Sequence, residues 1–283
     1  MSKKSDLFEQ NISDFIGSCD KLPSKLPDWM IALGIKPNAK IISSSRIGSK
    51  SKDNKTDVII NLDNCTPIKI SAKLSNADYF GNWYGHKRFI EEFSSDTFEK
   101  VTAATTLWAN AWILNEKSSP FIGVSISFGR RSGQTGQHFL DYFSVNDILT
   151  IVKGFEDDSL NKVANCLYID DKVPKDLNTF ISNLRPITLD SIKDAVDEFK
   201  LIYRPVNPLT SYSDRGKNVY TQFIPYSKSD NLITVTSKEE LCKLGKFYTV
   251  KPTSLNHNHI IKSLKKDFNI LIPVKVKEKK KKK

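Results

Sequence analysis

The sequence predicts an α/β or α+β fold in which helices flank a mixed β-sheet. Amphipathic helical segments and β-branched apolar segments interleave along the chain, which is typical of such folds. The composition, with 39% hydrophobic and 10% aromatic residues, is that of a globular protein. A chain of 283 residues is also long enough to bury a sizeable core.

Hydrophobic spacing predicts the helices. Residues 6–17 place apolar side chains three or four positions apart and end at a glycine. A short helix begins at Asp28, which can cap it, and ends at Gly34. Further helices are expected at residues 87–115, 145–155, 174–183, 190–202 and 238–245.

Two consecutive segments predict a β-hairpin. Residues 57–62 are β-branched and apolar, Asp63-Asn64 is a turn signal, and residues 67–74 alternate between apolar and polar side chains. Other strands are expected at residues 39–47, 120–128, 219–225, 231–236 and 268–276. The triplet His257-Asn258-His259 is interpreted as an exposed turn before a helix.

The formal net charge is +11, and the excess of about five that lies outside residues 275–283 suits a protein that approaches a polyanion, which by charge alone is either nucleic acid or an anionic membrane surface. Seven lysines against one glutamate in residues 275–283 supply six of these charges, and we interpret this tail as flexible and solvated. No run approaches the length of a membrane span, and no secretory signal pattern is present, so we expect no membrane association and a cytoplasmic location. The four cysteines lie far apart, a spacing that does not favour a zinc cluster.

The predicted hairpin brings together two residues that can do chemistry. Asp57 opens its first strand and Lys73 lies near the end of the second, so both are expected at the same end of the sheet. A carboxylate is a suitable ligand for Mg²⁺, and a lysine beside it can orient a water or stabilise charge on a phosphate. A simple surface ion pair is the alternative interpretation of this spacing.

The segments PDWMIALGI (27–35), KTDVII (55–60) and IKISAKLSN (68–76) resemble, in order, the active-site region of the PD-(D/E)xK nucleases. The nearest likeness is to small type II restriction endonucleases that cut CG-containing four-base sites, and it covers roughly residues 27–115. It implies a restriction-endonuclease-like fold, with one nuclease domain over residues 1–270 and a catalytic core at about 27–130. It also implies Mg²⁺-dependent cleavage of double-stranded DNA and a cognate DNA methyltransferase, and it allows a homodimer.

One position departs from the family pattern. The resemblance implies that Asp57, Ser71 and Lys73 form the catalytic group, but the family usually has an acidic or amide residue where this chain has Ser71. The metal would then rely on Asp57 and the Ala72 carbonyl, and such folds suggest Glu9 on the first helix as a further ligand. A non-catalytic nucleic-acid-binding protein on a decayed nuclease fold is the alternative.

Several polar and basic residues are candidates for contacting DNA. A glycine-rich segment at residues 129–138 carries arginines and glutamines, which can pair with guanine and adenine edges in the major groove, and a solvated surface loop is the alternative interpretation. A second basic loop covers residues 211–218, and strands and helices of the C-terminal third are expected to add contacts. The candidates are Asn76, Asn82, Lys87, Arg88, Arg130, Arg131, Gln134, Gln137, Arg215 and Lys217.

Overall fold

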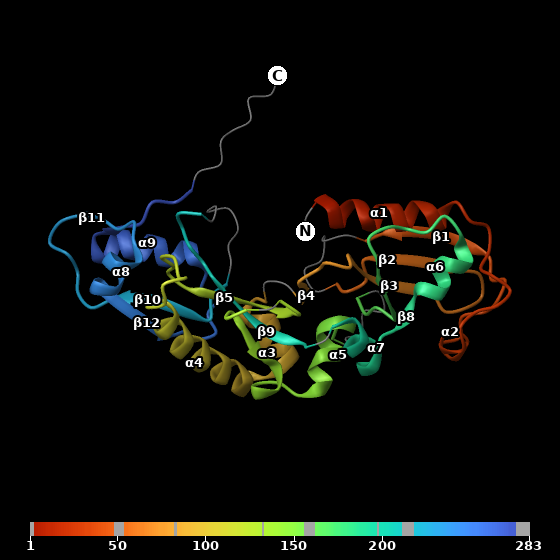
Figure 1. Cartoon of the computed structure of the whole chain (residues 1–283), viewed down its shortest axis with the longest axis horizontal. Helices are drawn as coiled ribbons and strands as arrows, with labels where there is room; N and C mark the ends of the chain where they lie inside the picture. The colour runs from red at the N-terminus through yellow and green to blue at the C-terminus, as the bar shows by residue number, and fades with distance from the viewer. Residues whose placement is uncertain are drawn as a thin grey trace, which may run out of the picture. The chain divides into compact units, whose positions relative to one another are not determined.

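The computed structural model describes residues 3–47, 54–81, 84–131, 133–155, 162–196, 198–210 and 218–275 (Figure 1). Helices and mixed β-sheets alternate along the chain, which confirms the predicted α+β class. The chain divides into two compact units. Unit 1 comprises Met1–Phe80 and Ser144–Phe199, and unit 2 comprises Gly81–Phe143 and Lys200–Lys283. The single domain expected over residues 1–270 stays a prediction.

Unit 1 is built on a five-stranded mixed sheet within the described residues, in the order β1-β2-β3-β7-β8. Neighbouring strands are antiparallel except β3 and β7, which run parallel. The hairpin predicted from residues 57–74 is confirmed as β2 and β3, which pair with Val58 opposite Ile70. The strands are β1 (Ile41–Arg46), β2 (Val58–Leu62), β3 (Ile68–Lys73), β7 (Cys166–Ile169) and β8 (Arg185–Pro186).

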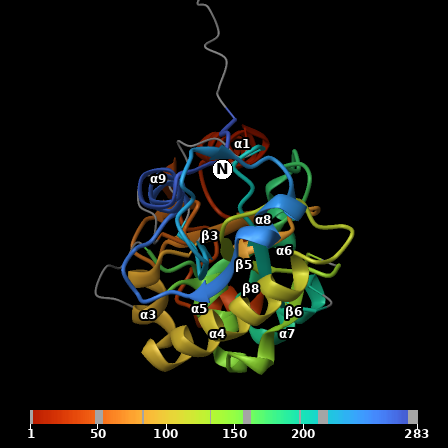
Figure 2. The ribbon, with the colours of Figure 1, turned by 90° about the vertical axis from the view of Figure 1, so that its left-hand side faces the viewer.

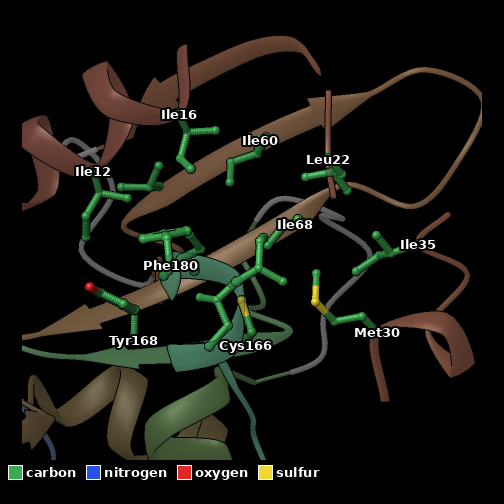
Figure 3. Close-up of a cluster of buried hydrophobic side chains, with 14 of the residues drawn as sticks. Ile12, Ile16, Leu22, Met30, Ile35, Ile60, Ile68, Cys166, Tyr168 and Phe180 are labelled. Carbon is green, nitrogen blue, oxygen red and sulfur yellow. The ribbon is translucent and has the colours of Figure 1, made fainter. Parts of the chain in front are cut away.

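The core of unit 1 lies between helix α1 (Lys3–Gly17) and this sheet, as Figure 3 shows. Ile12 and Ile16, one turn apart on α1, are fully buried and point toward Ile60 of β2. Each such side chain contributes roughly 1.5–3 kcal/mol by leaving water. The rings of Tyr168 and Phe180 also belong to this core, and their centroids lie 4.8 Å apart.

The remaining helices of unit 1 are short. They are α2 (Asp28–Ala32), α5 (Val145–Lys153), α6 (Leu177–Asn183) and α7 (Leu189–Ala195). Helix α5 begins with a capping box, in which Ser144 and Asp147 satisfy each other's backbone N–H groups. Gly154, whose φ of 109° favours glycine, ends α5.

The helix predicted over residues 190–202 is wrong in its second half. Helix α7 ends at Ala195, and residues from Lys200 onward form strand β9 (Lys200–Pro205) of unit 2. Strand β9 is central, with partners on both sides, so Leu201, Ile202 and Tyr203 are all buried. A continuous apolar run of this kind has no strand periodicity and cannot be distinguished from a buried helix by sequence.

In the described residues, unit 2 contains β5, β9 and β6 of a sheet ordered β4-β5-β9-β6, whose β4 spans the division of the units between Phe80 and Gly81, and two smaller pairings, β10 with β12 and β11 with β13. Its helices α3 and α4 lie against each other, and α4 also covers β10 and β12. The strands are β4 (Tyr79–Gly81), β5 (Val124–Gly129), β6 (Gly136–His138), β10 (Thr221–Pro225), β11 (Ile233–Thr234), β12 (Gly245–Thr249) and β13 (Ile270–Leu271). The helices are α3 (His86–Phe93), α4 (Ser95–Trp112), α8 (Lys238–Leu244) and α9 (His257–Phe268), with a 3₁₀ turn at Phe139–Asp141.

The helical segment predicted over residues 87–115 is two helices rather than one. Ser94 adopts a φ of 85°, which interrupts the helix, and its hydroxyl accepts a hydrogen bond from Thr97 N at 3.3 Å to cap α4. The hydrophobic spacing continues across the break because both helices bury aromatic rings in one cluster. Phe89, Phe93, Phe128 and Phe143 pack edge to face there.

The C-terminal part of unit 2 departs from two predictions. His257 is not in an exposed turn: it is the first residue of α9 and is fully buried. The strand expected at residues 268–276 is reduced to the short β13, because α9 continues to Phe268 and ends at the left-handed Asn269. Helix α9 packs on β10 and α8 on β12, and both helices face the viewer in Figure 2. None of the described helices has the length and apolar character needed to cross a membrane.

Candidate active site

The β2–β3 hairpin brings Asp57 and Lys73 together, as the sequence predicts. Asp57 precedes β2, and its backbone N–H donates to Ile70 O at 2.8 Å, which extends the antiparallel ladder by one residue. Lys73 is the last residue of β3, and its Nζ lies 2.9 Å from Asp57 Oδ2. The side chains of Asp57 and Lys73 are 14% and 18% exposed, so the pair is largely buried but solvent still reaches it.

The carboxylate of Asp57 is fixed by a backbone contact as well as by the lysine. Its Oδ2 accepts a hydrogen bond from Ala72 N at 2.8 Å, in addition to the one from Lys73 Nζ. A charge-assisted bond to a rigid strand amide removes much of the rotational freedom of the carboxylate. The orientation of Asp57 is therefore set before any ligand arrives.

The ammonium of Lys73 has an oxygen partner for each of its three N–H donors. Besides Asp57 Oδ2, Nζ donates to Ser71 Oγ at 3.1 Å and to Ala72 O at 2.9 Å. A carboxylate, a hydroxyl and a carbonyl oxygen thus converge on one positive charge. These are also the hard oxygen donors that Mg²⁺ accepts in proteins.

Glu9 of α1 belongs to the same electrostatic cluster. Its side chain is only 2% exposed, and its Oε2 accepts a hydrogen bond from Arg46 Nε at 2.8 Å. Burial raises the pKa of Glu9, and the negative charge of Asp57 raises it further. The hydrogen bond and charge of Arg46 oppose this shift in pKa, as does the charge of Lys73. The charges of both Asp57 and Lys73 therefore act on the pKa of this buried acid.

The residues present fit a hard divalent cation. The described residues hold no cluster of three or more acidic, histidine or cysteine side chains arranged for a metal. Asp57 and Glu9 supply two carboxylates, and the Ala72 carbonyl and Ser71 hydroxyl supply neutral oxygens. Mg²⁺ in proteins usually keeps several waters and binds only one or two carboxylates. Two carboxylates and two neutral oxygens are therefore ligands of the type that Mg²⁺ binds.

Arg46 is the residue of this cluster that the sequence analysis missed. It ends β1, and its guanidinium contacts both Glu9 and Asp6 of α1. Residues 39–47 are predicted to be extended, but the sequence does not indicate that this strand lies beside α1. Arg46 therefore holds a buried acid of the site in place without touching Asp57 in any described hydrogen bond.

The predicted DNA contacts near the hairpin differ in exposure. Asn76 is exposed after β3. Lys87 is 85% exposed and lies 3.7 Å from Glu91 one helical turn away. Arg88 is 15% exposed, pairs with Glu92 at 2.5 Å and stacks on the Tyr84 ring, so its guanidinium contributes to the packing of unit 2. Asn82, Arg215 and Lys217 lie outside the described residues.

The glycine-rich segment belongs to unit 2, whereas the hairpin belongs to unit 1. Arg131 and Gln134 are exposed, and Arg130 and Gln137 are half-buried. The segment is only partly a loop, because Gly136–His138 forms strand β6 and pairs with β9. The roles of these four residues in DNA recognition stay predictions.

No protein-family model matches the sequence, and a search of curated proteins returns no match.

Proposed function

We propose that this chain is a type II site-specific endonuclease that uses Mg²⁺ to hydrolyse phosphodiester bonds of double-stranded DNA. The observation that carries the proposal is the contact of Lys73 Nζ with Asp57 Oδ2 at 2.9 Å across adjacent strands. The buried acid Glu9 supports it further, because the charges of Asp57 and Lys73 both act on its pKa.

Asp57, Glu9 and the Ala72 carbonyl are the residues that would hold the metal. When bound, Mg²⁺ lowers the pKa of a coordinated water and offsets the negative charge of the phosphate. Asp57 is already oriented by Ala72 N, so little ordering is needed when a cation binds. Arg46 holds the side chain of Glu9 in place through its 2.8 Å hydrogen bond.

Lys73 would act directly on the reacting groups. Its flexible side chain can donate to the attacking water or to a phosphate oxygen, and its charge stabilises the transition state. Ser71 accepts a hydrogen bond from the same ammonium at 3.1 Å and is fully buried. We infer that Ser71 positions the lysine, while Glu9 supplies the second carboxylate that the family pattern places at position 71.

Plasmid digestion tests the proposal. Wild-type protein with Mg²⁺ should give discrete fragments, and Lys73→Ala or Asp57→Asn should reduce cleavage by at least about a thousandfold while duplex binding survives. Lys69→Ala is the matched control, because Lys69 lies on the same strand as Lys73. Undiminished cleavage by Lys73→Ala would refute the assignment, and so would equal loss in the Lys69→Ala control.

A second candidate function is nucleic-acid binding without catalysis. Ser71 favours it, because a hydroxyl is a weaker metal ligand than the carboxylate usual at that position. In that case the ion pair of Lys73 and Asp57 would serve stability only. Salt-dependent duplex binding without cleavage, in either Mg²⁺ or Mn²⁺, would support this second candidate over the first.

The endonuclease proposal implies further partners. Duplex DNA is the substrate, a second copy of the chain is a candidate partner for cutting both strands, and a methyltransferase acting on the same site would protect the host DNA. We also propose a cytoplasmic location. The four cysteines are free thiols, which agrees with a reducing compartment.

A further inference from the structure

The glycine-rich segment of unit 2 has a defined conformation. We call its described residues 130, 131 and 133–138 the 130–138 turn. Gly136 N donates to Gly133 O at 3.0 Å, and Gly133 has a φ of 101°, which favours glycine. A Cβ on Gly136 would lie 2.9 Å from Lys200 Cδ and 3.0 Å from Arg131 O. Glycine is therefore favoured at both positions, because it lets the chain turn tightly beside β9.

The 130–138 turn is fastened to the rest of unit 2 at two places. On one side, Tyr203 N of β9 donates to Thr135 O at 2.8 Å, and the ladder continues with Gly136 opposite Ile202. On the other side, the indole Nε1 of Trp108 on α4 donates to Gln134 O at 3.3 Å. A strand and a helix thus hold consecutive carbonyls of the same turn.

Trp108 is oriented for this contact by aromatic neighbours. Its ring lies 4.9 Å from that of Tyr203 and stacks on Trp112 at 5.3 Å with an interplanar angle of 13°. Trp108 and Trp112 are one turn apart on α4. Apolar packing explains the rings, but it does not require that the indole N–H reach the backbone of the turn.

The 130–138 turn presents side chains suited to base edges. Arg131 and Gln134 are exposed at its tip, and Arg130 is half-buried beside them. Arginine forms paired hydrogen bonds with guanine O6 and N7, and glutamine does so with adenine N6 and N7. Such paired contacts depend on geometry, so a turn held rigidly discriminates bases better than a mobile one.

We propose that the 130–138 turn reads base edges of duplex DNA and that Trp108 is the positioning residue that sets its sequence preference. The inference rests on the proposed function for its ligand, a DNA duplex, but not on cleavage. Trp108 acts through Gln134 O and does not itself touch DNA. Sequence preference should therefore depend on the indole N–H, whereas affinity for DNA of any sequence should not.

Binding measured in a cleavage-deficient Lys73→Ala background tests the proposal. The preferred duplex is first selected from a random pool, and its dissociation constant is compared with that of a scrambled duplex at one salt concentration. Trp108→Phe should lower the preference about fivefold, the equivalent of one neutral hydrogen bond. Trp112→Phe makes the same change of ring size but leaves the Trp108 N–H bond and a ring for Trp108 to stack on, so it should lower the preference by less than Trp108→Phe.

Two further variants separate positioning from packing. Arg131→Ala, at an exposed residue of the turn, should lower the preference about tenfold. Gly136→Ala should lower it at least as much as Trp108→Phe, because the added Cβ would lie 3.0 Å from the backbone oxygen of Arg131, within the turn itself. An unchanged preference in Trp108→Phe, or an equal loss in Trp112→Phe, would overturn the positioning role.

The outcome is separable from that of the nuclease proposal. A wild-type chain that binds a selected duplex, loses its preference in Trp108→Phe and never cleaves would support this inference while refuting the nuclease. If the wild-type protein cleaves DNA, but Trp108→Phe and Arg131→Ala leave the sequence preference unchanged, the nuclease proposal is supported and this inference is refuted. Failure to select any preferred duplex from the random pool would also overturn the inference.

Discussion

Replacement of Lys73 by methionine should show whether the oxygen atoms around its ammonium group bind a divalent cation. In the structure the ammonium contacts Asp57 Oδ2, Ser71 Oγ and Ala72 O, all within 3.1 Å. Methionine retains the length and apolar character of the side chain but removes its charge and donors. Three oxygen atoms would then face one another without a cation between them.

The expected loss of stability follows from the exposure of the pair. Removing one partner of a fully buried ion pair costs about 3–5 kcal/mol, whereas an exposed pair contributes under about 1 kcal/mol. Because Lys73 and Asp57 are 18% and 14% exposed, the variant should lose about 1–2 kcal/mol, intermediate between these limits. For a chain of this size, that corresponds to a fall of roughly 2–6 °C in melting temperature.

Calcium should raise the stability of the Lys73→Met variant more than that of the wild-type protein. A ligand at a hundred times its dissociation constant contributes about 2.7 kcal/mol, and Ca²⁺ accepts the same oxygens without supporting most Mg²⁺-dependent cleavage. In the wild-type protein the cation must first displace the ammonium, so its gain should be smaller. Thermal unfolding with and without Ca²⁺ measures both values, with Lys69→Met as the control. Equal gains in wild type and Lys73→Met would refute the reasoning.

Three other predictions concern the same fold. Glu9→Gln should lower cleavage at least about tenfold while leaving the melting temperature of the metal-free protein at neutral pH unchanged or raised, because burial and Asp57 both disfavour the ionised acid. Since the pKa of Glu9 is raised in the folded state, its stabilising contribution is complete below its unfolded pKa and is lost as pH rises through the folded pKa. Any stability advantage of Glu9→Gln over wild type should therefore shrink as the pH is lowered, and a growing advantage in acid would contradict the shift. Gly245→Ala should destabilise unit 2 by more than about 2 kcal/mol in denaturant unfolding, because the added Cβ would lie 2.3 Å from Ile224 O.

The local parts of the candidate site are predictable from sequence. Alternation over residues 67–74 and a turn signal before it identify the hairpin, and the hairpin alone brings Asp57 beside Lys73. The amphipathic spacing of α1 also predicts which of its faces is buried. Glu9 interrupts that apolar face and is held there by Arg46, a contact that no local pattern indicates.

The parts that the sequence does not predict depend on distant pairing. The apolar residues of β9 have the pattern of a buried helix because they lie between β5 and β6, which the chain reaches much earlier. The division into two units has no local signal either, since each unit joins two separated stretches of sequence. Tight packing around Gly136 likewise becomes visible only when Lys200 is placed beside it.

The parallel pairing of β3 with β7 has a consequence for synthesis of the chain. The strand that ends in Lys73 has its hydrogen-bonding edge completed only by Cys166–Ile169, and the chain between them includes Gly81–Phe143 of unit 2. A ribosome must therefore translate well beyond the hairpin before Ser71 and Ala72 gain their neighbour, and contacts so distant in sequence form slowly. A growing polypeptide would thus carry an unpaired strand edge at this position until Cys166–Ile169 has been made, and any hydrolytic capacity would emerge only after that point.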